Sequence, residues 1–139
     1  MLNPKKVYKL DFSKWRCGNY YTWPYRLGKG PTFLLNKQGF MCCLGQFSEQ
    51  EGIARSVLLG RVTPRSIPKE EIPAESLRQS VLFAGNSIYD HLLRKAVNIN
   101  DDKEIKNIAG KFLALRKLFI SHGCDIEIAN NPFDGLERL

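Results

Sequence analysis

Every second residue is apolar in two short stretches near the ends of the chain. One stretch runs from Tyr8 to Phe12 and the other from Cys124 to Ile128. A period of two places these side chains on one face of an extended chain. The pattern therefore predicts a first strand over residues 7–12 and a last strand over residues 124–129.

A β-hairpin is predicted between these two strands. The apolar runs Phe33–Leu35 and Phe40–Cys42 flank the polar residues 36–38 and Gly39. A glycine at this place can adopt the positive φ that hairpin loops require. We expect the two runs to pair as antiparallel strands.

Two helices are predicted from apolar residues at helical spacing. The first is expected from about Leu44 until Gly52, because glycine suits the position that follows a helix. The second is expected to begin at Asn86 or Ser87 and to run through Ala96.

The strongest helical pattern lies between Asp101 and Gly123. Asp101 and Glu104 match a capping box, which predicts that the helix begins there. Its apolar stripe consists of Ile105, Ile108, Ala109, Phe112, Leu115, Leu118 and Phe119. Strands at the start, middle and end with helices between them favour one α+β domain with a small, mostly antiparallel sheet packed by helices.

The 139 residues carry a formal net charge of +7, and all of it arises in the first third of the chain. Residues 1–47 contain eight Lys or Arg residues and one acid, whereas residues 48–139 contain 13 basic and 13 acidic residues. Ten of the 15 aromatic residues also lie within residues 1–47. A cationic segment with stacking rings attracts anionic, planar partners such as nucleotides or nucleic acid.

The candidate ligand site is the irregular segment 15–30, WRCGNYYTWPYRLGKG, where rings alternate with cations. Each stacked base contributes about 1–3 kcal/mol, and the cations add attraction to phosphate. The alternative is that rings such as Trp15 hold a long loop against the core. The candidate ligand-binding residues are Arg16, Tyr21, Trp23, Tyr25, Arg26 and Lys29.

Catalytic, metal and cofactor chemistry is not indicated by any motif. A nucleophilic Cys42 or Cys43 would need a base such as His91 or His122, but thiols in an apolar run are usually structural. Residues 28–32 lack the spacing of a P-loop, and no C-x-x-C pair is present for zinc. We expect a protein without cofactor or metal that is not an enzyme.

A cytoplasmic location is also expected. No stretch approaches the roughly 20 apolar residues that a transmembrane helix needs. The lysines near the N-terminus are not followed by the apolar region of a secretory signal. The four cysteines do not suggest a disulfide scaffold, so we expect reduced thiols and no membrane partner.

Several short motifs occur in a recognisable order. Lys14-Trp15, Leu34-Leu35-Asn36, Gly39 and Cys42-Cys43-Leu44-Gly45 are followed much later by Ile99-Asn100-Asp101. In this order they resemble a family of small phage and prophage proteins. The resemblance covers about half of the chain in separated blocks. It implies a virus-encoded protein that acts inside a bacterium.

The charge pattern and the resemblance together lead to one hypothesis and two alternatives. The hypothesis is a non-enzymatic phage-type accessory protein that binds an anionic host component, a nucleotide signal or nucleic acid, and so counters host antiviral defence. One alternative is a cysteine-dependent enzyme acting on a nucleotide, which substitution of Cys42 and Cys43 would inactivate. The other is an inhibitor that binds only a host protein, which weak salt dependence would distinguish. For the basic surface itself, an acidic surface of a host protein is a further anionic partner beside nucleotide and nucleic acid.

Overall fold

The computed structural model describes residues 6–17, 21–22, 33–84, 87–102 and 108–130. Within them, a small parallel sheet and a very short antiparallel pair accompany five α-helices and two 3₁₀ helices. In chain order the elements are β1 (Lys6–Asp11), β2 (Arg16–Cys17), β3 (Tyr21–Thr22), α1 (Cys43–Gln50), α2 (Arg55–Leu58), η1 (Pro64–Ser66), η2 (Lys69–Glu71), α3 (Ala74–Gln79), α4 (Ser87–Asp101), α5 (Ile108–Ile120) and β4 (Cys124–Asn130).

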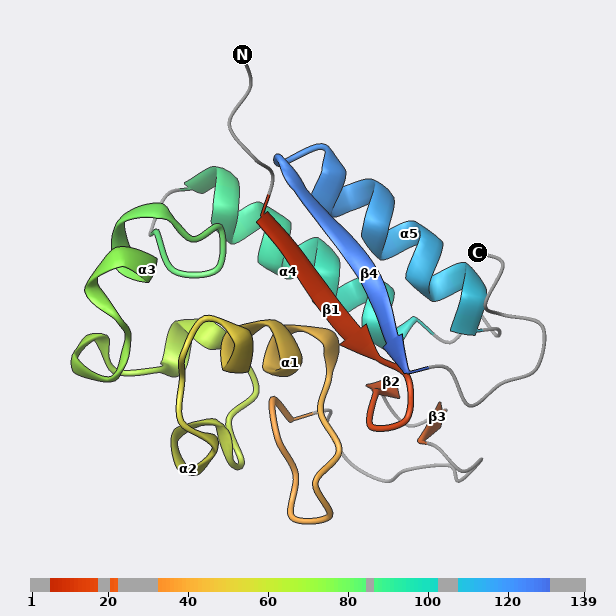
Figure 1. Cartoon of the computed structure of the whole chain (residues 1–139), viewed down its shortest axis with the longest axis horizontal. Helices are drawn as coiled ribbons and strands as arrows, with labels where there is room; N and C mark the ends of the chain where they lie inside the picture. The colour runs from red at the N-terminus through yellow and green to blue at the C-terminus, as the bar shows by residue number, and fades with distance from the viewer. Residues whose placement is uncertain (1–5, 18–20, 23–32, 85–86, 103–107, 131–139) are drawn as a thin grey trace.

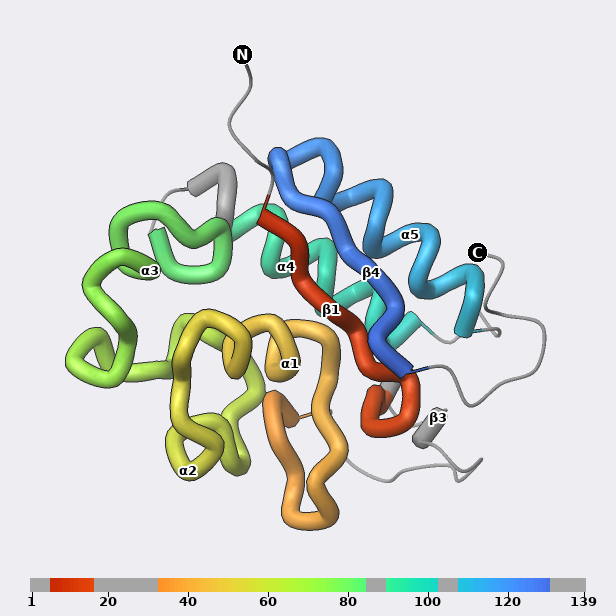
Figure 2. The backbone as a smooth tube through the Cα atoms, in the orientation of Figure 1, coloured from red at the N-terminus to blue at the C-terminus, as the bar shows by residue number. Residues whose placement is uncertain are grey.

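The main sheet pairs the first strand with the last one, and the two strands are parallel. Lys6 lies opposite Cys124, and the register continues to Leu10 opposite Ile128 before a bulge. Figures 1 and 2 show β1 and β4 side by side, although they come from opposite ends of the described chain. The amino ends of both strands therefore meet at one end of the molecule and their carboxyl ends at the other.

The prediction of a mostly antiparallel sheet is wrong. The two end strands form where the alternation predicts them, but alternation identifies a strand without identifying its neighbour or its direction. Parallel strands need a crossover connection, and here all the helices from α1 to α5 lie between β1 and β4. The antiparallel pairing in the described residues is confined to β2 and β3, which are two residues long each.

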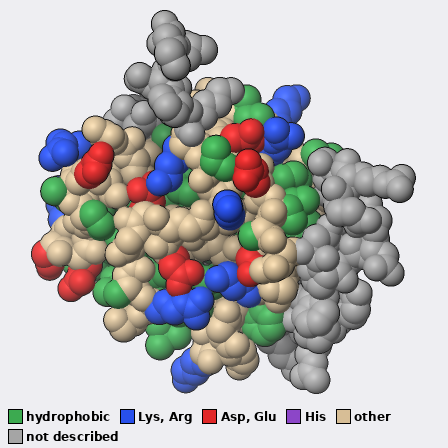
Figure 3. All heavy atoms as spheres, in the orientation of Figure 1, with side chains coloured by type: hydrophobic (Ala, Val, Ile, Leu, Met, Phe, Trp, Pro, Cys, Tyr) green, Lys and Arg blue, Asp and Glu red, His purple; other side chains and the backbone are tan. Residues whose placement is uncertain are grey.

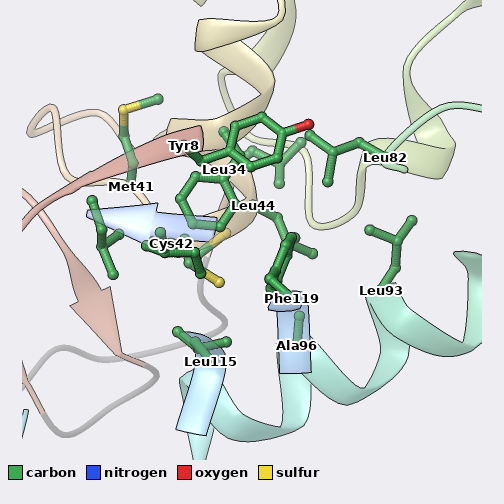
Figure 4. Close-up of a cluster of buried hydrophobic side chains, with 14 of the residues drawn as sticks. Tyr8, Leu34, Met41, Cys42, Leu44, Leu82, Leu93, Ala96, Leu115 and Phe119 are labelled. Carbon is green, nitrogen blue, oxygen red and sulfur yellow. The ribbon is translucent and has the colours of Figure 1, made fainter. Parts of the chain in front are cut away.

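Helices cover one face of the sheet. Tyr8 of β1 and Ile126 of β4 point into the core, whereas Lys9 and Glu127 are exposed on the other face. α1 packs against β1, and α5 packs against both β4 and α4. The Tyr8 ring stacks on Phe47 of α1 with 4.8 Å between ring centroids. Figure 4 shows Tyr8 in this cluster of buried apolar side chains.

Two glutamines of α1 complete the outer edge of β1. Gln46 and Gln50 are one helical turn apart, so their amides lie on the same side of the helix. The Gln50 amide accepts the N–H of Lys9 and donates to the Lys9 carbonyl, both at 2.7 Å. The Gln46 amide makes the same two bonds with Asp11, at 2.7 and 3.1 Å. The two amides thus take the place of a neighbouring strand, which protects an otherwise open edge.

The predicted hairpin of Phe33–Leu35 with Phe40–Cys42 forms in part. The N–H of Asn36 donates to the carbonyl of Phe40 at 2.9 Å and the N–H of Cys42 donates to the carbonyl of Phe33 at 3.2 Å, but neither arm is a regular strand. Its turn forms as expected, with Gly39 at a φ of 90°. The first run also forms an isolated parallel bridge to Leu59, and the second run forms one to Trp15. Extended residues take the neighbours that the core supplies, and here some of these come from other parts of the chain.

The predicted short helix is confirmed as α1, which begins one residue earlier than expected. Cys42 is the N-cap, and its Sγ accepts the N–H of Gly45 at 3.4 Å. Gly45 has no room for a side chain, because a Cβ there would lie 1.8 Å from the carbonyl oxygen of Leu34. The chain leaves the helix at Gly52, whose φ is 99° as the prediction requires.

The boundary between the last two helices differs from the prediction. Asp101 is the last residue of α4 rather than the first residue of the following helix, so the predicted boundary is wrong, and Glu104, the other residue of the predicted capping box, lies outside the described residues. The start of α4 at Ser87 is as predicted. The apolar stripe of α5 is confirmed from Ile108 onward, while residues 103–107 lie outside the described residues.

A buried lysine explains why α4 can end in acidic residues. The Lys111 ammonium donates to the carbonyls of Ile99, Asn100 and Asp102 at 3.2, 2.9 and 2.7 Å. These bonds satisfy carbonyls at the end of the helix, and the positive charge complements the negative end of the helix dipole. None of the helices described is long and apolar enough to cross a membrane.

Candidate functional site

The carboxyl end of β1 leads directly into the segment that the sequence marks as a ligand site. Trp15 is fully buried, and its ring lies 5.3 Å from that of Phe12. Arg16 then pairs with Thr22 in the short β2–β3 ladder. The first aromatic residue of the segment is therefore part of the core, as the structural alternative for Trp15 predicted.

Asn100 of α4 fixes this start of the segment. Its Oδ1 accepts the Nε1–H of Trp15 at 2.6 Å and the backbone N–H of Cys43 at 3.1 Å. Its Nδ2 donates to the carbonyl of Arg16 at 3.0 Å and to Oδ1 of Asp101 at 2.9 Å. One buried amide thus connects β2, the first residue of α1 and the end of α4. The sequence gives no sign of this role, because the partners of Asn100 are distant in the chain.

The far end of the segment is held in a similar way. The N–H of Leu34 donates to the carbonyl of Arg61 at 2.7 Å, and the N–H of Gly60 donates to the carbonyl of Leu35 at 2.9 Å. Both leucines are buried. The described residues on both sides of 23–32 are therefore anchored to the folded core.

The structure locates only part of the predicted ligand set. Trp23, Tyr25, Arg26 and Lys29 lie outside the described residues, and Tyr21 is described only by its backbone in β3. Arg16 is buried. A guanidinium with so little exposed surface offers little to a solvent-borne phosphate, so Arg16 belongs to the support of the segment.

The fold brings acids next to two cations of the basic third. Lys6 Nζ lies 3.8 Å from a carboxylate oxygen of Glu51, and Lys14 Nζ lies 3.5 Å from one of Glu49. Glu49 lies in the last turn of α1 and Glu51 directly follows the helix, so both acids come just after residue 47. In the view of Figure 3, acidic and basic side chains lie close together rather than in separate patches. The positive field around β1 is therefore weaker than the sequence alone suggests.

The two adjacent cysteines occupy structural positions. Cys42 and Cys43 are buried, and both are free thiols. Burial, partly offset by the bond from the Gly45 N–H, raises the pKa of the Cys42 thiol to about 12. Of the histidines considered as bases, His91 is exposed on α4, and Nδ1 of His122 lies 3.1 Å from the Leu118 carbonyl oxygen of its own turn. A thiol with a raised pKa and no access for a substrate is a poor nucleophile.

A pocket that the sequence does not predict lies at the amino ends of β1 and β4. Its volume is about 470 Å³, and α1 and α3 contribute to its walls. Glu51 lines this pocket, and its side chain is 8% exposed. The Glu51 carboxylate accepts hydroxyl hydrogen bonds from Tyr8 at 2.5 Å, Ser76 at 2.8 Å and Ser80 at 3.1 Å. These residues come from three separate parts of the chain, which is why no sequence motif indicates the cluster.

The electrostatic effect of Glu51 is visible at its neighbours. Burial first and the hydrogen bond to Glu51 second raise the pKa of the Tyr8 phenol. Burial and then the negative charge of Glu51 raise the pKa of the Cys124 thiol, which also lines the pocket. The pocket therefore holds its phenol and its thiol in the protonated form at neutral pH.

The described residues contain no group of three His, Cys, Asp or Glu side chains that could hold a metal ion. Their polar clusters, around Asn100 and around Glu51, are built for hydrogen bonding. Comparison of the chain with known protein families, with curated proteins and with solved structures gave no match.

Proposed function

We propose that the protein acts by binding, as a phage-type accessory protein that holds an anionic host component on segment 15–30. The observation that carries the proposal is the excess of eight basic residues over one acid in residues 1–47, combined with the aromatic run of segment 15–30. Rings that stack on bases and cations that meet phosphate are the two parts of nucleotide and single-strand recognition. The role in countering host defence follows from the resemblance to phage proteins.

The arrangement around the segment supports this proposal. Binding segments usually lie on loops that a rigid scaffold positions. Here the β2–β3 ladder and the backbone bonds of Leu34 anchor the described residues on either side of 23–32, and Asn100 holds Trp15 at the start of the segment. The residues proposed to contact the ligand are Trp23, Tyr25, Arg26 and Lys29, with Tyr21 beside them.

Two cations of the basic third do not belong to the proposed site. Glu49 and Glu51 neutralise Lys14 and Lys6, so these lysines contribute little attraction to a distant phosphate. The burial of Cys42 and Cys43 also disfavours the alternative of a cysteine-dependent enzyme. The proposed partner is therefore a nucleotide or nucleic acid held by residues 23–29, without covalent chemistry.

The test is a binding titration with a fluorescent single-stranded oligonucleotide and with labelled mononucleotides, at low and at moderate salt. The double variant Trp23→Ala/Arg26→Glu should weaken binding strongly and leave the melting temperature nearly unchanged. The matched control is Lys69→Glu, which makes the same change in net charge on η2, outside the segment. It should bind as the parent protein does.

Salt dependence distinguishes the two ligand classes. Affinity for nucleic acid should fall steeply with added salt, because phosphate contacts release condensed counterions. A mononucleotide should show a gentler slope. If neither ligand binds at low salt and the double variant unfolds, the aromatic run is part of the core. The remaining alternative would then be a protein partner.

A further inference from the structure

The pocket at the amino ends of β1 and β4 has a chemistry opposite to that of segment 15–30. Its charged lining residues are one lysine, Lys6, and two acids, Glu51 and Glu75. Their formal charges sum to −1, so the pocket disfavours an anion. Its volume of about 470 Å³ lies in the range of small-molecule sites, which is about 300–1,000 Å³.

The Glu51 carboxylate in this pocket is held in a fixed orientation. Three hydroxyls, from Tyr8, Ser76 and Ser80, donate to Glu51, and they come from β1, from α3 and from the residue that follows α3. A carboxylate has about four acceptor positions, so roughly one remains for a further donor. The orientation is set before any ligand arrives, which lowers the entropy cost of binding.

The remaining position is on Oε1, because Tyr8 and Ser80 both donate to Oε2 and Ser76 alone donates to Oε1. Lys6 already places an ammonium group near this carboxylate, but the contact is loose. Its Nζ lies 3.8 Å from Glu51 Oε2, beyond hydrogen-bond distance, and 5.5 Å from the centroid of the Tyr8 ring. The Lys6 side chain is 49% exposed. A carboxylate beside an aromatic ring is the combination that recognises an ammonium ion. Lys6 therefore shows which chemical group the pocket accepts, and it can swing out into solvent.

We propose that this pocket binds a small aliphatic amine, preferably a diamine, whose ammonium group displaces Lys6 from Glu51 and from the Tyr8 ring. Glu75 is exposed in the first turn of α3 and lines the same pocket, so it offers a carboxylate for the second ammonium group. The hydroxyls of Ser76 and Ser80 stay bonded to Glu51 and keep it in place. This site is independent of the nucleotide site proposed above and lies at the other end of the sheet.

The test uses diaminobutane as the probe in ligand-observed NMR, with the full chain and its variants. Butanediol has the same length without charge, and inorganic phosphate has the opposite charge; neither should bind. Lys6→Ala removes the competing ammonium and should increase the affinity for diaminobutane by up to about fivefold, the upper range for an exposed ion pair. Lys9→Ala is the matched control, because it removes the same charge from the same strand outside the pocket. It should bind as the parent protein does.

Substitutions of glutamates test the proposed contact between Glu75 and the second ammonium group. Glu75→Gln should weaken diaminobutane binding, whereas Glu71→Gln on the neighbouring η2 should leave it unchanged, and neither exposed position should affect folding. Equal affinities in Lys6→Ala and Lys9→Ala would overturn the proposal. So would binding of butanediol as strong as that of diaminobutane, binding of phosphate, or no binding of the diamine by the parent and by Lys6→Ala.

Discussion

Single side chains in this protein connect elements that the chain order keeps far apart. Asn100 uses both atoms of its amide to join β2, α1 and α4. Lys111 closes the end of α4 from the neighbouring helix. Because each is buried and bonded to several partners, a replacement would leave backbone or indole groups without a hydrogen bond. These residues are therefore as important for the fold as the large apolar ones.

Phe112 is the apolar residue whose contribution can be measured most directly. It is 3% exposed and meets the Phe12 ring edge-on, with 5.7 Å between centroids. Phe112→Ala should lower the free energy of unfolding by about 3–5 kcal/mol, because it removes a buried ring and leaves a cavity. Urea denaturation measures the loss.

The neighbouring Leu113 provides the control for this substitution. It lies on the same helix but is 47% exposed. Leu113→Ala should therefore change the free energy of unfolding by no more than about 0.5 kcal/mol. Equal losses in the two variants would contradict the assignment of the buried face of α5.

At the scale of the elements, the contact between α1 and β1 can be tested quantitatively. Here two glutamine side chains of α1 bond to the edge of β1 where a neighbouring strand would otherwise pair. Gln46 is almost fully buried, whereas Gln50 is exposed. Gln46→Ala should cost about 1–3 kcal/mol, since it leaves the N–H of Asp11 without a partner and leaves its carbonyl with only the long bond from the Lys14 N–H. Gln50→Ala should cost less, because water can replace the amide at Lys9.

Hydrogen exchange identifies the source of the loss. The amide of Asp11 should exchange faster in Gln46→Ala, and the amide of Lys9 should exchange faster in Gln50→Ala. Amides of α5 should keep their protection relative to the global stability. An unchanged exchange rate at Asp11 would show that Gln46 does not support this edge.

The elements differ in how far they could be predicted from the sequence. The first and last strands, α1 and the stripe of α5 were predictable because one buried face imposes a period on neighbouring residues. The direction of the sheet was not, because alternation is the same in parallel and antiparallel strands. The run 33–42 looks like a hairpin locally, and two backbone hydrogen bonds do join its arms, but its isolated bridges are to Trp15 and Leu59, which no local pattern indicates.

The ends of helices and the polar clusters were harder to predict. Acidic residues favour the start of a helix, so Asp101 suggested a beginning. In the structure it ends α4, where the Lys111 ammonium, from another helix, supplies the compensating charge. The Glu51 pocket left no local signal, since Tyr8, Ser76 and Ser80 are brought to it only by the tertiary fold. Of the predicted ligand site, the structure describes the residues that anchor the segment, whereas Trp23, Tyr25, Arg26 and Lys29 lie outside the described residues.

For the whole molecule, one buried phenol and two buried thiols predict a loss of stability at alkaline pH. Burial is the largest cause of the raised pKa of Tyr8, of Cys42 and of Cys124. Cys42 moves from 9.0 to about 12. In the unfolded chain this thiol releases its proton from about pH 9 upward, while the folded protein still holds it. The free energy of unfolding should therefore fall as the pH rises from about 9 towards 12.

Melting temperatures between about pH 8 and pH 11 test this expectation. Cys42→Ser should show a smaller decrease than the parent protein, because a serine hydroxyl does not ionise in this range and still accepts the Gly45 N–H. Tyr8 and Cys124 should account for part of the decrease that remains. A parent protein with a constant melting temperature, or a Cys42→Ser variant with the same slope, would contradict the assignment.

The pairing of β1 with β4 has a consequence for the synthesis of the protein. On the ribosome β1 is made early, and its partner strand is among the last of the described segments to emerge. Until then Tyr8 and Leu10 can pack against α1, and the glutamines of α1 can bond to the outer edge of β1, but its inner edge has no partner. Native contacts between such distant residues form slowly and leave apolar surface exposed in the meantime. The nascent chain therefore depends on α1 to protect β1 until β4 completes the sheet.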